Sequence, residues 1–243
     1  AFGITNIPHC GVYTYKWTVA YQAVDGCVPA ASDYTYLGGT SDTSANPKIR
    51  YNNPGIYAVS LQTIAPGQTC FSPVITRYDT VKGKPVVTLN APLSSCESAT
   101  IAPTAVTACF STNATYQWSF PGGSPASSTL PVPGNILYNT AGTYTITLSV
   151  TNECGTTTRT STITITPLPV ADAGPDKSFC SGASTTIGSA PVSGNTYQWT
   201  PVTGLSSSTI ANPTLSLNNP GATPLVFTYV VTVTNSNNCV KTD

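Results

Sequence analysis

The sequence YNTAGTYTITLSV at residues 138–150 contains the pattern that decides the fold. From Tyr144 onward, apolar residues alternate strictly with Thr and Ser, and this period of two predicts a β-strand with one buried face. Similar alternating runs occur at residues 57–61 (YAVSL) and 229–233 (YVVTV), again after turn-forming Asn, Pro and Gly residues. The chain therefore repeats one strand-forming unit three times.

A tryptophan precedes each of these strands. The triplet YQW at residues 116–118 recurs at 197–199, and a looser version, YKW, lies at 15–17. A Trp at one place in each unit is typical of the core of an immunoglobulin-like sandwich, so we expect Trp17, Trp118 and Trp199 to be buried rather than to stack on sugars.

A tyrosine begins each alternating run, at Tyr57, Tyr144 and Tyr229. In immunoglobulin-like sandwiches a Tyr in this position forms a tyrosine corner, in which the phenol hydroxyl bonds back to the backbone. We expect this structural role for all three rather than contact with a ligand.

The composition favours an all-β protein and excludes several function classes. Charged residues make up only 7% of the chain and the formal net charge is zero, without a visible basic stripe. A nucleic-acid-binding protein needs clustered Lys and Arg, so this partner class is excluded. The sequence has no apolar stretch of membrane-spanning length and no signal peptide. Because it contains no Met, we expect a processed or partial product.

Proline-containing segments at residues 82–85 (KGKP) and 167–169 (PLP) separate the repeated units. They predict three domains, at residues 1–83, 84–168 and 169–243. We expect the first domain to be divergent and to lack its opening strand, and the third to lack its last strand.

The eight cysteines indicate disulfides formed in an oxidising compartment. Cys154 and Cys239 each lie ten residues after a repeated Tyr, while Cys96 and Cys180 each lie eleven after a repeated Pro. This spacing predicts the pairs Cys96–Cys154 and Cys180–Cys239, each inside one domain.

The pairing of the other four cysteines stays open, because four cysteines allow three connectivities. Cys10 and Cys109 both precede the Trp strand and so occupy equivalent sites. A Cys10–Cys27 bridge would fasten the long loop of the first domain, and Cys70–Cys109 would then cross a domain boundary.

Few residues are candidates for chemistry. Asp172 and Asp176 lie at a domain joint, where calcium could bind carboxylate oxygens, but two carboxylates are a small ligand set and a solvated linker is the favoured interpretation. His9 is the only histidine, and no Gly-x-Ser-x-Gly motif accompanies it. We therefore expect neither catalysis nor a cofactor.

Two groups of motifs resemble known repeats. WSFPGG at 118–123 and GTYTITL at 142–148 resemble PKD-like domains, a branch of the immunoglobulin-like sandwiches. ADAGPD at 171–176, YQWTP at 197–201 and IANPT at 210–214 resemble the repeats of very large adhesins of gliding bacteria, which the type IX secretion system exports. Asp79-Thr80-Val81 matches the short O-glycosylation pattern of such bacteria, which makes Thr80 a candidate glycan site.

The resemblance implies a non-catalytic stalk in a surface adhesin on the bacterial outer surface, used for attachment and gliding. Its partners would be neighbouring repeats, the secretion and motility machinery, and a polysaccharide or protein ligand. The alternative is a substrate-binding accessory module of a secreted hydrolase, for which Tyr13, Tyr15, Tyr34 and Tyr36 are the candidate aromatic cluster. The repeat type disfavours a third alternative, a eukaryote-type receptor ectodomain.

Overall fold

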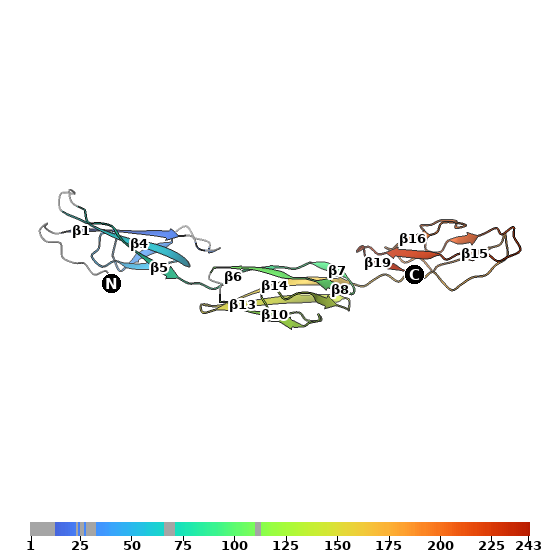
Figure 1. Ribbon diagram of the computed structural model, residues 1–243, viewed down its shortest axis with the longest axis horizontal. Coiled ribbons are helices and arrows are strands. Elements are labelled where there is room, and N and C mark those ends of the chain that lie inside the picture. Colours follow the sequence, from blue (N-terminus) through green and yellow to red (C-terminus); the bar gives the residue numbers. More distant parts are fainter. Residues whose placement is uncertain (1–12, 23, 25–26, 28–32, 66–70, 110–112) are drawn as a thin grey trace.

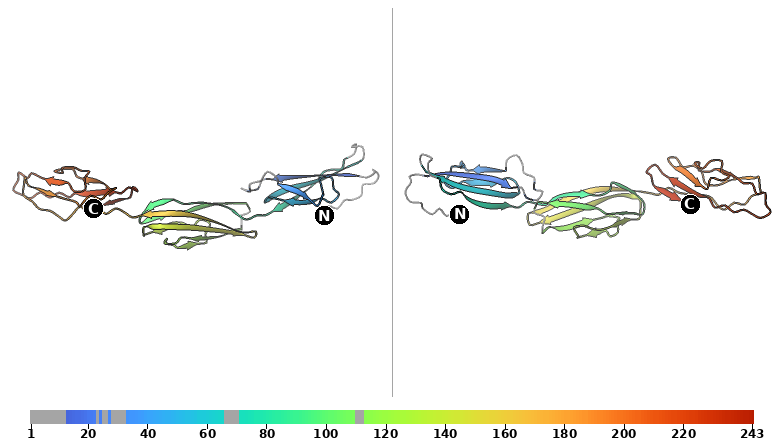
Figure 2. Two further views of the ribbon diagram at one scale, coloured as in Figure 1. Left: turned by 180° about the vertical axis from the view of Figure 1, so that it is seen from behind. Right: turned by 45° about the horizontal axis from the view of Figure 1, so that its top comes forward.

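The computed structural model describes residues 13–22, 24, 27, 33–65, 71–109 and 113–243. The described residues contain β-strands and no helix, so the predicted all-β class is confirmed. The strands form three groups that lie in a row along the long axis of the molecule (Figure 1), and the row is equally clear in two further views (Figure 2). We call these groups the first unit (β1–β5), the second unit (β6–β14) and the third unit (β15–β19).

The first unit is built around a long antiparallel hairpin. Its larger sheet has the order β1-β4-β5, and β2 pairs with β3 in a second, two-stranded sheet. The strands are β1 (Thr14–Gln22), β2 (Tyr34–Leu37), β3 (Lys48–Tyr51), β4 (Gly55–Ile64) and β5 (Ile75–Val81).

The second unit has the largest sheet, with the order β11-β10-β13-β14-β7 and two-stranded pairs β12-β8 and β6-β9. All of its pairings are antiparallel except that of β14 with β7. The strands are β6 (Val86–Asn90), β7 (Ser94–Cys96), β8 (Ala99–Ile101), β9 (Thr104–Ala108), β10 (Thr115–Ser119), β11 (Ser127–Ser128), β12 (Ile136–Tyr138), β13 (Gly142–Asn152) and β14 (Gly155–Thr166).

The third unit has a related layout with fewer strands. Its sheets have the orders β16-β18-β19 and β15-β17. The strands are β15 (Ser184–Thr186), β16 (Thr196–Thr200), β17 (Thr214–Ser216), β18 (Val230–Thr234) and β19 (Val240–Thr242). Residues 82–85 and 167–169 fall in or beside the segments that connect the units, and the exact domain boundaries stay a prediction.

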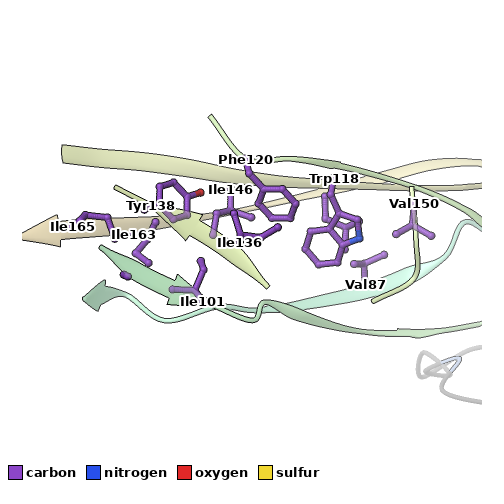
Figure 3. Close-up of a cluster of buried hydrophobic side chains, with 12 residues drawn as sticks. Val87, Ile101, Trp118, Phe120, Ile136, Tyr138, Ile146, Val150, Ile163 and Ile165 are labelled. Carbon is purple, nitrogen blue, oxygen red and sulfur yellow. The ribbon is translucent and has the colours of Figure 1, made fainter. Parts of the chain in front are cut away.

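Alternating residues of facing strands fill the core of the second unit. Trp118, Phe120 and Ile136 are fully buried, and the close-up in Figure 3 shows them between the strands together with Tyr138, Ile146 and other aliphatic side chains. The alternation of apolar and Thr residues in β13 and β14 places Ile and Leu on this inner side and Thr on the outer side. Burial of these side chains is the main stabilising contribution to the unit.

The three tryptophans share one contact. In each unit the Trp is buried, and its indole N–H donates a 2.9 Å hydrogen bond to a backbone carbonyl in the segment that follows the Trp strand. The carbonyl belongs to Ser44 for Trp17, to Leu130 for Trp118 and to Ile210 for Trp199. Each indole therefore fills the core and also fixes a neighbouring connection, which crosses between the sheets in the second and third units and joins β2 to β3 in the first.

We expect Trp118→Ala to lower the free energy of unfolding of the second unit by about 3–5 kcal/mol, because it leaves a large cavity and removes the indole donor. Leu130→Ala is the matched control: the Leu130 side chain is exposed and only its carbonyl is used, so the loss should stay within about 0.5 kcal/mol. Urea unfolding measures both, and equal losses in the two variants would contradict this role of the indole.

Candidate functional site

The structure joins neighbouring units by disulfides. Cys27, in the segment after β1, is bonded to Cys109, directly after β9, and this bond links the first unit to the second. Cys96 at the end of β7 is bonded to Cys239, directly before β19, and links the second unit to the third. The Cα–Cα distances are 4.6 Å and 5.6 Å. Both joints are thus covalently fastened in addition to the chain itself.

This pattern corrects the pairing expected from cysteine spacing. Cys96–Cys154 and Cys180–Cys239 are wrong, and Cys154 and Cys180 are exposed free thiols. The physical reason lies in β14, which begins directly after Cys154 and ends with Thr166 paired to Cys96. A strand of 12 residues spans about 40 Å, whereas a disulfide needs Cα atoms within about 7 Å.

The two bridges considered for the remaining cysteines are also wrong. Cys27 and Cys109 are bonded to each other, so neither Cys10–Cys27 nor Cys70–Cys109 can form. Cys10 and Cys70 lie outside the described residues.

An asparagine contacts the linker at both joints. In the turn between β13 and β14, Asn152 accepts the Cys154 N–H through Oδ1 and donates from Nδ2 to the Gly83 carbonyl, at 2.9 and 2.7 Å. Asn235 does the same in the third unit: it accepts the Cys239 N–H at 3.0 Å and donates to the Pro167 carbonyl at 3.1 Å. The repeated Thr-Asn sequence therefore orders a turn and holds the linker against it.

An ion pair adds to the first joint. The ammonium of Lys82 contacts the Glu153 carboxylate, and this interaction raises the pKa of Lys82. Both side chains are exposed, so the pair contributes to orientation more than to stability.

The tyrosine corners differ between units. The Tyr57 hydroxyl donates to the Asn53 carbonyl and the Tyr144 hydroxyl to the Thr140 carbonyl, four residues back in each case. The Tyr229 hydroxyl instead donates to the carbonyl of Thr203.

The strand register explains this correction for Tyr229. In the second unit Trp118 pairs with Leu148, and Tyr144 lies four residues before Leu148. In the third unit Trp199 pairs with Val231, and the residue four positions before Val231 is Phe227. The position equivalent to Tyr144 is therefore Phe227, and the equal spacing of Tyr and Cys does not mark equal positions.

The remaining sequence candidates are placed as follows. Asp172 and Asp176 are exposed, and Asp172 accepts the Gly174 N–H at 2.9 Å. The described part of the chain holds no group of three or more His, Cys, Asp or Glu side chains that could bind a metal. Thr80 is exposed on β5, the edge strand of its sheet. His9 lies outside the described residues.

The candidate aromatic cluster is not an exposed row. Tyr13, Tyr15, Tyr34 and Tyr36 are all half-buried, and Tyr15 packs against the core of the first unit. Tyr34 and Tyr36 meet edge to face, with ring centroids 5.7 Å apart. Stacking on a sugar needs an open ring face, which these contacts reduce.

A comparison with protein families finds a match within the second unit. Residues 87–165 match the PKD domain. This segment is the second unit, so the predicted PKD-like, immunoglobulin-like sandwich is confirmed there. No curated protein matches the chain. Among the described residues, no helix has the length and apolar character needed to cross a membrane.

Several solved structures are similar to the chain at low identity. The three N-terminal domains of the bacteriophage RB49 Highly Immunogenic Outer Capsid protein match at 12% identity, covering 98% of this chain and 88% of that one, with a TM-score of 0.42. The titin fragment I67–I69 matches at 12% identity, covering 96% and 86%, with a TM-score of 0.32. BT4661, a SusE-like surface located polysaccharide binding protein from Bacteroides thetaiotaomicron, matches at 12% identity, covering 85% and 52%, with a TM-score of 0.25.

Alkylation under native, non-reducing conditions should modify Cys154 and Cys180 quickly and leave Cys96, Cys239, Cys27 and Cys109 unmodified, because only the first two are exposed free thiols. Peptide mapping by mass spectrometry then identifies the crosslinked pairs. A peptide that links Cys96 to Cys154 would contradict the structure.

A half-buried tyrosine, Tyr51, makes the first unit sensitive to alkaline pH. The Tyr51 hydroxyl donates to Asp79 Oδ2 at 2.6 Å, and burial together with this bond to a carboxylate raises the pKa of Tyr51 well above its ordinary value. Arg77 Nε lies 3.1 Å from Asp79 Oδ1 and holds the carboxylate in place.

Because the folded state holds the Tyr51 proton more tightly than the unfolded state does, this contribution to stability is complete below the unfolded pKa of about 10. It should decrease as the pH rises above that value. Thermal unfolding between about pH 8 and pH 12 measures the effect. Tyr51→Phe should be less stable at neutral pH by about 1 kcal/mol and should show a weaker alkaline decrease. An unchanged pH profile would contradict the assignment.

Proposed function

We propose that this chain is a non-catalytic stalk segment of an extracellular surface protein, in which disulfides fasten one sandwich to the next. PKD and immunoglobulin-like domains are typically non-catalytic modules. Disulfides persist in oxidising, extracellular compartments. The observation that carries the proposal is the position of the two bonds, Cys27–Cys109 and Cys96–Cys239, between units rather than inside them.

The order of the bonded cysteines along the chain strengthens the mechanical interpretation. Cys96 precedes Cys109, so the two crosslinked segments overlap. The shortest covalent path between the chain ends runs to Cys27, crosses to Cys109, returns to Cys96 and crosses to Cys239. It has 26 peptide units before Cys27, 13 between Cys96 and Cys109 and 4 after Cys239, about 43 in all. Most of the polypeptide therefore bears no load when the ends are pulled.

The more specific role we propose is a repeat segment of a bacterial adhesin on the outer surface, exported by type IX secretion and used for attachment and gliding. The motifs at residues 171–176 and 197–201 support it, since they resemble repeats of such adhesins. Thr80, exposed on an edge strand, remains a candidate for O-glycosylation. A calcium ion at Asp172 and Asp176 remains a weaker proposal. The ligand would be a polysaccharide or protein bound by another part of the filament.

The alternative, a substrate-binding accessory of a secreted hydrolase, depends on open aromatic faces. The half-burial of Tyr13, Tyr15, Tyr34 and Tyr36 does not favour it. We therefore prefer the stalk.

Single-molecule pulling of the 243-residue chain from its two ends tests the stalk. With both disulfides intact, the fully stretched length should reach only about 150 Å, at about 3.5 Å for each of the 43 load-bearing units. After reduction it should reach about 850 Å, because all 242 peptide units then extend.

Cys96→Ser separates the contribution of one joint. Without the Cys96–Cys239 bond, the shortest covalent path should run from residue 1 to Cys27, cross to Cys109 and follow the chain to Asp243. This path gives a fully stretched length of about 560 Å. Cys154→Ser is the matched control, since that thiol is exposed and free, and should leave the length at the value of the oxidised chain. An oxidised chain that extends as far as the reduced one would refute the stalk proposal.

A further inference from the structure

One exposed aromatic ring lies on the outer face of the first unit, the side of the sheet β1-β4-β5 that points away from the core. Asp79 points to the inner face, where its carboxylate contacts Tyr51 and Arg77. Because successive side chains of a strand alternate between the two faces, Tyr78 and Thr80 lie on the outer face. Tyr78 is 64% exposed, and Thr80 is exposed as well. The ring is therefore open to solvent and is not part of the core.

The register of the sheets shows that a ring is unusual at this position. Counted from the residues that pair with the two tryptophans, Tyr78 of β5 is equivalent to Thr162 of β14, and Thr80 is equivalent to Thr164. Every outward position of β14 from Thr156 to Thr164 is Thr, and the facing positions of β13 are Thr or Ser. No outward side chain of β10, β13, β14, β16, β18 or β19 is aromatic. Packing within the sandwich therefore does not require a ring at Tyr78.

Small side chains lie directly across the sheet from the ring. Tyr78 pairs with Ala58 of β4, and Ala58 pairs with Ala20 of β1. Only methyl groups therefore stand opposite the ring on the outer face, and they leave room for a flat group of the size of a pyranose to lie against it.

A threonine hydroxyl lies on each side of the ring along β5. Thr76 and Thr80 are both two residues from Tyr78, which places each about 7 Å away on the same face. The Thr76 hydroxyl is hydrogen-bonded to the Ser60 hydroxyl at 2.8 Å. None of the hydrogen bonds among the described residues uses the Thr80 hydroxyl. Thr80 is therefore the neighbour of the ring whose hydroxyl is open to modification.

We propose, on the basis of the glycosylation proposed above for Thr80, that Tyr78 is the stacking platform for the first sugar of this glycan. The pyranose extends from Thr80 Oγ1 along the strand toward Tyr78. The C–H groups on one side of the sugar contact the face of the phenol ring, whose negative quadrupole attracts them. The sugar hydroxyls stay in water.

The modification joins Thr80 to a sugar through a single new bond. Thr80 Oγ1 bonds to the anomeric carbon of a glycosyl phosphate donor, the hydroxyl loses its proton, and the phosphate departs. Tyr78 takes no part in this transfer and acts only on its product, by orienting the attached sugar.

Attachment to Thr80 makes a single ring sufficient. One exposed ring offers a separate sugar a small contact, which does not offset the translational and rotational freedom that the sugar loses. A sugar linked two residues away is held at an effective concentration of about millimolar or higher, so a weak contact is enough to order it. The occupant is therefore the glycan of this chain. It covers a ring that a chain with only 7% charged residues otherwise exposes.

The full chain with one O-linked hexose at Thr80, introduced by semisynthesis, tests the platform. We expect the sugar C–H protons to shift upfield in NMR spectra, because they lie over the ring of Tyr78. The melting temperature of the first unit should rise by about 4 °C relative to the chain without hexose. Tyr78→Ala should remove both effects, whereas Tyr78→Phe, which keeps the ring, should preserve them. Equal sugar shifts in Tyr78→Ala and the unsubstituted chain would overturn the proposal.

The second unit provides a matched control. A hexose at Thr164 has Thr162 in the place of the ring, so its protons should stay unshifted, and Thr162→Tyr should shift them upfield. An upfield shift at Thr164 without that substitution would overturn the role of the ring. Free methyl hexoside at millimolar concentration should also stay unshifted with the unmodified chain. A shift equal to that of the linked hexose would make a free saccharide the occupant and overturn the proposal.

Mass spectrometry of the chain from its natural source distinguishes the stacking from the glycosylation itself. Glycan mass on the peptide that contains Thr80 supports the modification. Absence of this mass would refute the glycosylation and, with it, the natural occupant of the platform. Glycan mass on Thr80 together with unshifted sugar protons would overturn only the stacking on Tyr78.

Discussion

The buried indole of each unit is the interaction on which the rest of the structure depends. A tryptophan at the centre of the core donates its N–H to a backbone carbonyl of a connecting segment, which in the second and third units crosses between the sheets. The ring supplies apolar area in domains that have few charges and short strands, and the hydrogen bond fixes where the crossing segment lies. Without that hydrogen-bonded connection, the distance between the two sheets would not be defined, and the strands that it joins would have no fixed register.

A fixed register at the core also positions the ends of each sandwich. In the second unit, the turn between β13 and β14 lies at one end, and β7 lies beside the last residues of β14, one strand length away. Asn152 and Asn235 hold the linkers against the ends of their units, and Cys96 and Cys109 reach cysteines of the neighbouring units. The molecule thus combines separate cores with covalent joints, which suits a segment that transmits force.

The sequence predicted the cores well and the connections poorly. The alternation of apolar and polar residues after Tyr144 and the repeated Trp are local patterns, and they can be read directly from the sequence. Cysteine pairing depends on distance in space, and the equal spacings placed Cys96 with Cys154 although the length of β14 lies between them. The connection between the paired residues Thr234 and Val240 is one residue longer than the one between the equivalent pair, Thr151 and Thr156. Cys239 also lies later in its connection than Cys154 does, so the equal Tyr-to-Cys spacing aligned Tyr229, instead of Phe227, with Tyr144.

The sequence alone determined the all-β class, the threefold repetition and the buried Trp residues, because these features follow from composition and from the periodicity of residues close to one another in the chain. Only the tertiary structure decided that the disulfides join neighbouring units and that Cys154 and Cys180 stay free. Those features depend on which ends of the sandwiches meet and on how far each strand extends. Such distances emerge only when the sheets have formed and packed.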